Sequence, residues 1–378
     1  MAGTQSPAVG HVKAAKPETW VLAVEHAIVL PLNRDTALID HTVITVGDRI
    51  VWVGPSRSAQ VPPHARRLDA RGAYVIPGLA DMHVHIRSSN DLPRFLAAGV
   101  TTVRNMNGQP AHLVLRRRVA RGEIPGPKIY TTGPSIFNKF SLFGADKRFA
   151  RVRTTADAEK LVREQSRAGY DMIKVLNGIE LPVYNRLLEA ARGARVPVVG
   201  HVVSQVGSAR SLAAGQVSLE HAELSLFDDK ADLASGARAI ARAGAWVGTI
   251  ISDRTGSCAP PTMETRRVIS ALRRAGVQML AGSDTNIGPI MPGVGLHCEL
   301  RTLVAAGLTP YETLVTATRN PGKFAATHLK ESVPAGTITV GARADMLVLN
   351  SDPRIDIRAA TRPRSVIVRG VLVNGPRK

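Results

Sequence analysis

Two patterns of apolar and polar positions divide the chain into a middle part and two ends. In the middle part, short apolar runs recur, and longer stretches with apolar residues at helical spacing, such as residues 156–168 and 182–192, lie between them. The first predicted strand ends near His83. Seven further strands are predicted after it, at residues 100–106, 128–132, 172–176, 197–201, 217–221, 246–250 and 278–284.

This alternation of strands and helices indicates an α/β fold. Eight strand–helix units over residues 77–328 fit a (β/α)8 TIM barrel. A doubly wound parallel sheet is the alternative. That fold commonly carries a Gly-rich phosphate-binding sequence after its first strand, and no such sequence follows here.

The two ends of the chain carry short β-type runs separated by turn residues. Near the amino terminus these runs are residues 20–24, 42–46 and 49–54, and near the carboxyl terminus they are 337–340, 345–349, 365–369 and 371–373. Because both ends share this pattern, we predict one small discontinuous β-sandwich domain made of residues 18–76 and 329–378. Residues 77–328 would form the barrel.

The composition is that of a globular protein, with 44% hydrophobic residues among 378. No apolar stretch approaches the ~18 residues that a transmembrane helix needs. Residues 1–17 lack the apolar region of a signal peptide, although a chain trimmed of its signal would look the same. Cys258 and Cys298 form no close motif, so we expect two unpaired thiols and, by default, a cytoplasmic protein.

The formal net charge is +19, which attracts nucleic acid, anionic surfaces or acidic small molecules. The basic residues nevertheless stand in short, scattered clusters, and aromatic residues make up only 4% of the chain, too few for a base-stacking platform. We therefore expect neither nucleic acid nor a membrane as a partner. The charge favours a small-molecule substrate that is anionic.

Residues able to bind a metal ion fall at the ends of the predicted strands. His83 and His85 close the first strand, and because side chains alternate along a strand, both imidazoles project to the same side. Active sites of TIM barrels lie at the carboxyl ends of their strands. The other candidates lie in or end the fourth, fifth, sixth and eighth strands, and they are Lys174, His201, His221 and Asp284. We predict that these six side chains converge around divalent metal.

Together with their neighbours, these residues resemble the amidohydrolase superfamily over nearly the whole chain. Within it, the chain is most similar to imidazolonepropionase-like and prolidase-like metal hydrolases, which include Xaa-Pro dipeptidases and ochratoxin-type amidases. One departure is Asn105, where relatives often carry aspartate. The matching segments are PGLADMHVH (77–85), IK (173–174), GH (200–201), EHA (220–222), GSD (282–284) and VGARADMLVL (340–349).

The resemblance implies a binuclear centre, usually of zinc, bridged by a Lys174 side chain that carbon dioxide has carboxylated. His83, His85 and Asp284 would hold one ion, and His201 and His221 the other. A hydroxide bridging the two metals would attack the substrate carbonyl. Asp284 would accept the hydroxide proton and pass it to the leaving amine.

From this we predict a homo-oligomeric enzyme that cleaves an amide or peptide-like C–N bond, in a dipeptide, an N-acyl amino acid or an ochratoxin-like amide. One alternative is a mononuclear hydrolase or deaminase of cyclic amides or amidines, which would not need Lys174. The others are a barrel that has lost catalysis and serves as a binding module, and a basic nucleic-acid binder.

Three further residues are candidates for substrate contact. His297 follows Asp284 near the start of a helix, and Arg254 lies in the loop after the seventh strand, where its guanidinium could bind a carboxylate through two hydrogen bonds. Tyr184 is the third, with a buried structural hydroxyl as its alternative. The Phe-rich segment 134–151 is either a lid over the pocket or an insertion that packs against a helix.

Overall fold

The short apolar runs of the middle part form parallel strands in the computed structural model, which describes residues 20–138, 146, 148–252 and 258–374. Two short additional strands, β9 (Ile136–Phe137) and β10 (Ala150–Arg151), pair beside β11. All eight strands expected from the sequence are present: β6 (Leu79–Val84), β7 (Val100–Asn105), β8 (Lys128–Thr131), β11 (Ile173–Val175), β12 (Val198–Gly200), β13 (Ser218–Glu220), β14 (Trp246–Gly248) and β15 (Gln278–Leu280).

Hydrogen bonds connect these strands in a cyclic order. β6, β7 and β8 pair in parallel, and so do β11, β12, β13, β14 and β15 in turn. A parallel bridge between Thr132 and Met172 links β8 to the residue before β11. A second bridge between Val84 and Thr285 returns from the end of β15 to β6. The predicted α/β class with a parallel sheet is confirmed, and the carboxyl ends of these strands share one face.

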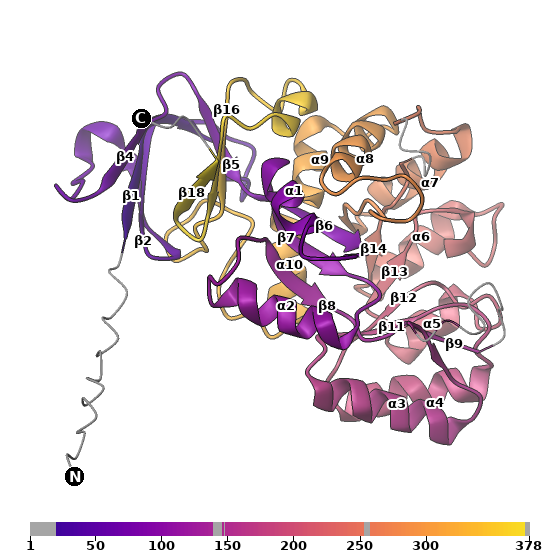
Figure 1. Ribbon diagram of the computed structural model, residues 1–378. Coiled ribbons are helices and arrows are strands. Elements are labelled where there is room, and N and C mark those ends of the chain that lie inside the picture. The colour runs from indigo at the N-terminus through magenta and orange to yellow at the C-terminus, as the bar shows by residue number, and fades with distance from the viewer. Residues whose placement is uncertain (1–19, 139–145, 147, 253–257, 375–378) are drawn as a thin grey trace, which may run out of the picture.

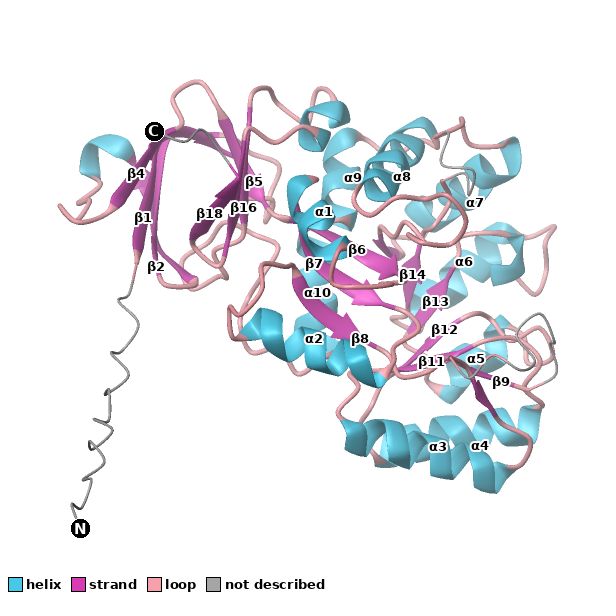
Figure 2. Ribbon diagram, viewed as in Figure 1, coloured by secondary structure: helices cyan, strands magenta, loops and turns pink. Residues whose placement is uncertain are grey.

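Helices alternate with the strands and lie around them (Figure 2). α3 shows why they form where they do: Thr154 and Asp157 make a capping box at its start, and Gly169 ends it in the left-handed conformation. Ala158 and Val162 are buried on one face of α3. The helices are α1 (Asp91–Ala97), α2 (Pro110–Ala120), α3 (Thr155–Ala168), α4 (Leu181–Gly193), α5 (Ser208–Ala214), α6 (Leu233–Arg242), α7 (Met263–Arg274), α8 (Val294–Ala305), α9 (Pro310–Thr316) and α10 (Arg319–His328).

Segments from the two ends of the chain form one sheet of eight strands (Figure 1). The strand order is β18-β17-β16-β5-β1-β2-β3, with β4 paired to β1, and the antiparallel pairing of β5 with β16 joins the two ends. The strands are β1 (Val21–Val29), β2 (Leu38–Val46), β3 (Arg49–Pro55), β4 (Arg66–Asp69), β5 (Tyr74–Pro77), β16 (Met346–Leu349), β17 (Ser365–Val368) and β18 (Val371–Asn374).

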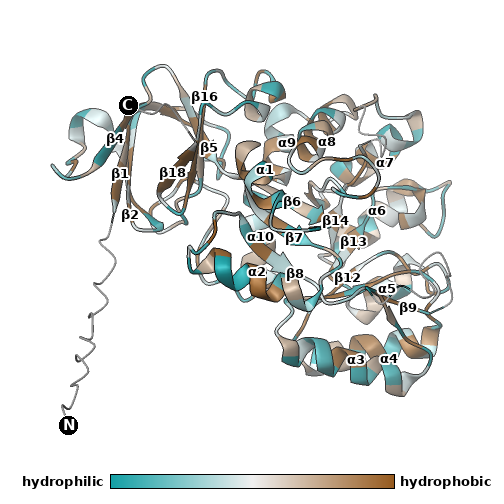
Figure 3. Cartoon of the chain, in the orientation of Figure 1, coloured by the Kyte–Doolittle hydropathy of each residue, from teal (hydrophilic) through white to brown (hydrophobic). Residues whose placement is uncertain are grey.

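This terminal sheet curls around a core of its own. Val24 and Val43 from the amino-terminal strands share one buried cluster with Met346 and Ile367 from the carboxyl-terminal strands. The strands are correspondingly hydrophobic, whereas helices such as α2 and α3 carry both hydrophilic and hydrophobic residues (Figure 3). No helix among the described residues is long and apolar enough to cross a bilayer.

One predicted strand, at residues 337–340, is wrong. Gly336 and Gly341 flank it with φ of 78° and 87°, so the backbone turns at both ends of the run. The segment is irregular instead: Ile338 is buried and its N–H donates to the carbonyl of Pro31 at 3.0 Å.

The expectation of two unpaired cysteines is also wrong. Cys258 and Cys298 form a disulfide with their Cα atoms 5.0 Å apart. It joins the segment after β14 to α8. The sequence offers no sign of this bond, because 40 positions separate the two residues and only the fold makes them neighbours.

Reduction of this disulfide should lower the free energy of unfolding by about 3 to 4 kcal/mol, because the bond constrains a loop of 40 residues in the unfolded chain. Urea unfolding followed by circular dichroism, with and without a thiol reductant, measures the change. The Cys258→Ser/Cys298→Ser double variant is the matched control and should not respond to the reductant. An unchanged wild-type midpoint, with both thiols shown to be free, would contradict this expectation.

Candidate metal centre

The six predicted ligands stand at the carboxyl ends of five strands of the parallel sheet. His83 lies in β6 and His85 just follows it, while Lys174 lies in β11. His201 and His221 come directly after β12 and β13, and Asp284 follows β15. The common direction of the strands therefore brings residues from distant parts of the sequence to one face.

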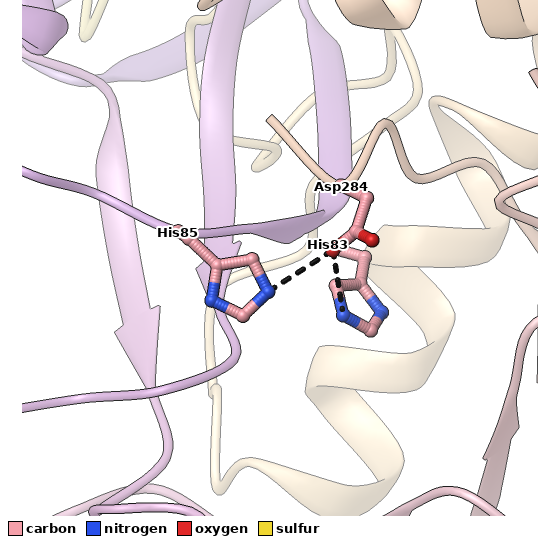
Figure 4. Close-up of side chains that lie close together, drawn as sticks. All are labelled: His83, His85 and Asp284. Atoms are coloured by element: carbon pink, nitrogen blue, oxygen red, sulfur yellow. Dashed lines mark hydrogen bonds and ion pairs between the residues drawn. The ribbon is translucent and has the colours of Figure 1, made fainter. Parts of the chain in front are cut away.

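Asp284 stands between His83 and His85, the two histidines at the carboxyl end of β6 (Figure 4). Its Oδ1 lies 3.0 Å from His85 Nε2 and 3.5 Å from His83 Nε2. One ligand atom from each of the three residues falls within 4.8 Å of the others. Two imidazoles and one carboxylate at this spacing suit a divalent ion such as zinc.

The remaining three residues continue this cluster. Lys174 Nζ lies 3.1 Å from His83 Nε2. The ring centroid of His221 is 5.1 Å from that of His83 and 4.9 Å from that of His201. The structure thus brings all six predicted residues into one connected group.

Burial sets the protonation states of this cluster. It lowers the pKa of His83 and His201 well below the usual range and that of His221 to about 3, so these imidazoles are neutral and able to bind metal. Burial also lowers the pKa of Lys174 to about 8. For Asp284, burial would raise the pKa, but the hydrogen bond from His85 and the neighbouring histidines outweigh it, so the net shift is downward and the group is an anion.

The donor set fits a metal ion. His221 Nδ1 is buried and has no hydrogen-bond partner among the described residues. An unpartnered polar atom in such a position costs about 1–3 kcal/mol. A cation beside His221 would remove that penalty and use the lone pairs of neutral imidazoles and an anionic carboxylate.

The backbone around the cluster is strained. His221, Ile250, Asp284 and Asn286 have φ of 69°, 41°, 54° and 71°, in the left-handed region that non-glycine residues rarely adopt. Such conformations cost about 1–3 kcal/mol each and collect at functional sites. Asn286 holds its segment in place by donating through Nδ2 to the carbonyl of His85 at 2.8 Å.

Sequence reasoning missed the buried ion pair behind the cluster. Glu220 Oε2 accepts a hydrogen bond from His83 Nδ1 at 2.9 Å, and Arg104 Nη2 donates to both Glu220 oxygens at 2.8 Å. Arg104 Nε also donates to the carbonyl of Met82 at 2.5 Å. Because Nδ1 donates its proton to Glu220, the Nε2 of His83 carries a lone pair and faces the cluster. The sequence signal for this ion pair was the presence of one charged residue, Arg104 or Glu220, within each of two predicted strands.

Asn105, the departure from the family pattern, stabilises the backbone at the carboxyl end of β6. Its Oδ1 accepts from the backbone N–H of Ile86 at 2.9 Å, and its Nδ2 donates to Thr131 Oγ1 at 3.0 Å. It therefore fixes the chain directly after His85.

Two of the three predicted substrate residues, Tyr184 and His297, make contacts away from the metal-ligand cluster. Tyr184 is fully buried on α4 and its hydroxyl donates to Gln216 at 2.7 Å, which are the contacts of a core residue. His297 on α8 contacts the carbonyl of Ala98, beyond the end of α1, through Nε2 at 2.8 Å. Neither makes a hydrogen bond to the cluster within the described ranges. Arg254 lies outside the described residues, as does part of the Phe-rich segment 134–151, whose described portion includes β9 and β10.

Comparison with known proteins gives consistent matches. A sequence model of the "Amidohydrolase family" matches residues 74–375. An adenine deaminase of Deinococcus radiodurans is 30% identical over 338 residues, covering 85% of this chain and 57% of the deaminase, so the chain spans little more than half of that relative. An imidazolonepropionase of Salinispora arenicola is 25% identical over 378 residues, covering 89% and 92%. A prolidase structure complexed with N-methylphosphonate-L-proline is 23% identical, with a TM-score of 0.78 over 94% of this chain and 100% of the other.

We expect Glu220→Gln to weaken metal binding about 10- to 100-fold, because His83 loses the carboxylate that orients it. The same substitution should cost about 3–5 kcal/mol in unfolding free energy, since Arg104 stays buried without its counter-ion. Chelator competition measures the affinity, and urea unfolding measures the stability.

The Arg104→Met/Glu220→Gln double variant separates the two effects. It removes both buried charges, so it should regain most of the stability while metal binding stays weak. If the double variant binds metal as tightly as the wild type, Glu220 does not orient His83 for a metal ion.

Proposed function

The chain belongs to the Amidohydrolase family, and on that basis we propose that it hydrolyses the amide or peptide-like C–N bond of a dipeptide, an N-acyl amino acid or an ochratoxin-like amide. The observation that carries the proposal is the cluster of neutral imidazoles, a carboxylate and a buried lysine at one face of the strands. We also infer that the cyclic strand order is that of a (β/α)8 barrel, with the terminal sheet as a β-sandwich beside it.

Two divalent ions, zinc in this proposal, would be held by the six residues. His83, His85 and Asp284 would bind one ion, His201 and His221 the other, and Lys174 would bridge them. When bound, the ions would supply Lewis acidity that polarises a carbonyl and lowers the pKa of water.

Lys174 would act as a carbamate. Its neutral amine would attack the carbon of carbon dioxide, so that an N–C bond forms while one C=O π bond opens. The nitrogen would then lose one proton to water, which leaves an anion with two carboxylate oxygens. Burial favours the neutral amine, because it lowers the pKa of Lys174 to about 8. The 3.1 Å approach of Nζ to His83 Nε2 supports this role, because a carboxylate formed on Nζ would lie among the histidines.

Asp284 would carry the proton during catalysis. The downward shift of its pKa keeps Asp284 ionised, and the ionised carboxylate is the form that can accept a proton from the attacking water. It would then release that proton to the nitrogen of the leaving amine. Its backbone N–H donates to the carbonyl of His83 at 2.8 Å, which holds it over the cluster.

The segment between Asp284 and α8 favours a substrate with an apolar group. Ile287 and Met291 in this segment are 39% and 48% exposed, and Val294 at the start of α8 is 52% exposed. The N–H of Ile287 donates to the carbonyl of Asp284 at 3.0 Å, so this apolar surface begins beside the proposed proton carrier. The net charge of +19 favours an anionic substrate.

A mononuclear hydrolase or deaminase of cyclic amides or amidines is the second candidate. His83, His85 and Asp284 form a metal-sized group without the other three residues. Adenine deaminase and imidazolonepropionase are among the relatives. Metal analysis separates the candidates, since the first requires two equivalents per chain and the second one.

A substrate screen tests the main proposal. Zinc-loaded protein should release amine from at least one of the Xaa-Pro dipeptides, N-acyl amino acids or ochratoxin-like amides, with adenine and cyclic amides as the competing set. Asp284→Asn should lower turnover at least ~100-fold, because proton transfer is lost. Turnover of the competing set alone would favour the second candidate, and near-normal turnover of the Asp284→Asn variant would assign proton transfer elsewhere.

Lys174→Ala should lose bound metal and activity together, with partial recovery when a small carboxylic acid is added. Activation of metal-stripped wild-type enzyme by zinc and bicarbonate should increase as the pH rises through about 8, where the amine of Lys174 loses its proton. At lower pH the ammonium form cannot react. A Lys174→Ala variant with two metals and full activity would show that no carbamate is needed.

A further inference from the structure

A cavity of about 440 Å³ lies at the opposite end of the strands from the metal centre. Its walls include Thr101 near the start of β7, Lys128 at the start of β8, and residues of α2. Asp345 and Arg369 close it from the side of the terminal sheet. The cavity therefore sits where the terminal sheet meets the α/β part, and the metal centre contributes none of its lining.

Three carboxylates of the cavity lining are held by ion pairs and hydrogen bonds. Asp171 accepts from Arg116 at 2.6 Å and from the N–H of Thr131 at 2.8 Å. Glu331 pairs with Lys128 and accepts from the hydroxyl of Tyr130 at 2.8 Å.

Asp345 is engaged in the same way. It accepts from Arg343 Nε at 2.5 Å and from the N–H of Arg369 at 2.8 Å. Asp48, the fourth carboxylate of the lining, lies 3.5 Å from Arg49 Nε. The lining holds five cationic side chains against these four carboxylates, so a ligand would meet a net positive wall; the five are Arg116, Arg117, Lys128, Arg343 and Arg369.

Two arginines of the cavity lining have guanidinium nitrogens without hydrogen-bond partners among the described residues. Arg343 is 7% exposed, and its Nη1 is buried without a hydrogen-bond partner among the described residues. Arg117 lines the cavity and its side chain takes part in no ion pair or hydrogen bond within that part of the chain. An unpartnered buried guanidinium nitrogen is best satisfied by an anion.

Another part of the lining is apolar. Val119, Ile129, Leu329 and Val368 line the cavity and are buried. A bare inorganic ion would leave this surface uncovered, whereas a short hydrocarbon body would cover it.

We propose that this cavity binds a small organic anion, with a carboxylate or phosphate group on Arg343 and Arg117 and a short apolar body against Val119 and Ile129. The site is separate from the metal centre and does not depend on the reaction catalysed there. Because the ligand would contact both the terminal sheet and the α/β part, its binding should stabilise the folded protein.

Isothermal titration calorimetry on the metal-loaded protein tests this site, with isovalerate and isobutyl phosphate as probes and sodium chloride at equal ionic strength as the blank. We expect saturable binding of at least one probe and a matching rise in Tm. The preferred probe identifies the anionic group.

Two variants locate the binding. Arg117→Ala removes an exposed side chain with no partner, and Arg343→Lys keeps a cation for Asp345 while removing the free Nη1. Each should weaken binding about tenfold or more, the effect of losing a hydrogen bond to a charged group. Arg118→Ala, a neighbouring arginine on α2 outside the cavity lining, is the matched control and should bind as the wild type does.

Unchanged binding in either Arg117→Ala or Arg343→Lys would place the anion elsewhere and overturn the proposal. Equal weakening in Arg118→Ala would reduce the effect to overall charge and would also overturn it. A wild-type protein that binds neither probe would overturn it as well.

Discussion

The buried pair of Arg104 and Glu220 is the interaction on which the centre of this protein depends. Both side chains are withdrawn from water inside parallel strands, where each charge alone would be very costly. The two charges neutralise one another, and Arg104 donates two hydrogen bonds to Glu220. Ser218 donates another hydrogen bond to Glu220, and the carbonyl of Met82 accepts one from Arg104 Nε. The second function of Glu220 is to hold His83 by Nδ1. One ion pair therefore joins β6, β7 and β13 and also orients an imidazole.

The common direction of the strands explains why the chemistry gathers at one face. Carboxyl ends of neighbouring parallel strands meet, so a polar residue at each end is close to the others however far apart they lie in sequence. Several of the non-glycine residues with left-handed φ lie at these ends, including His221 and Asp284. Such strain persists only where the surrounding structure fixes the backbone, and here the neighbouring strands and the Asn286 hydrogen bonds do so.

Much of this arrangement could be predicted from the sequence, because it follows from local periodicity. Short apolar runs located all eight parallel strands, and a histidine, lysine or aspartate at the end of a run identified the cluster. What depends on the rotation of a side chain could not be predicted in the same way. Tyr184 stands on the buried face of α4, in agreement with the structural alternative for this residue rather than with substrate contact. His297 contacts Ala98. Arg104 and Glu220 look like unremarkable charges until the strands are paired, and Cys258 meets Cys298 only in the folded chain.

The choice of lysine at position 174 follows from the charges around it. The Arg104–Glu220 pair is neutral overall, and the four histidines are neutral because they are buried, so Asp284 carries the main negative charge of the cluster. A protonated lysine there is disfavoured by burial, which lowers the pKa of Lys174. Conversion to a carbamate would replace that unfavourable cation by an anion next to His83. Two divalent cations carry four positive charges, and a second anion beside Asp284 would offset part of that charge. Burial of the lysine thus favours the neutral amine, which is the form from which the proposed carbamate would be made.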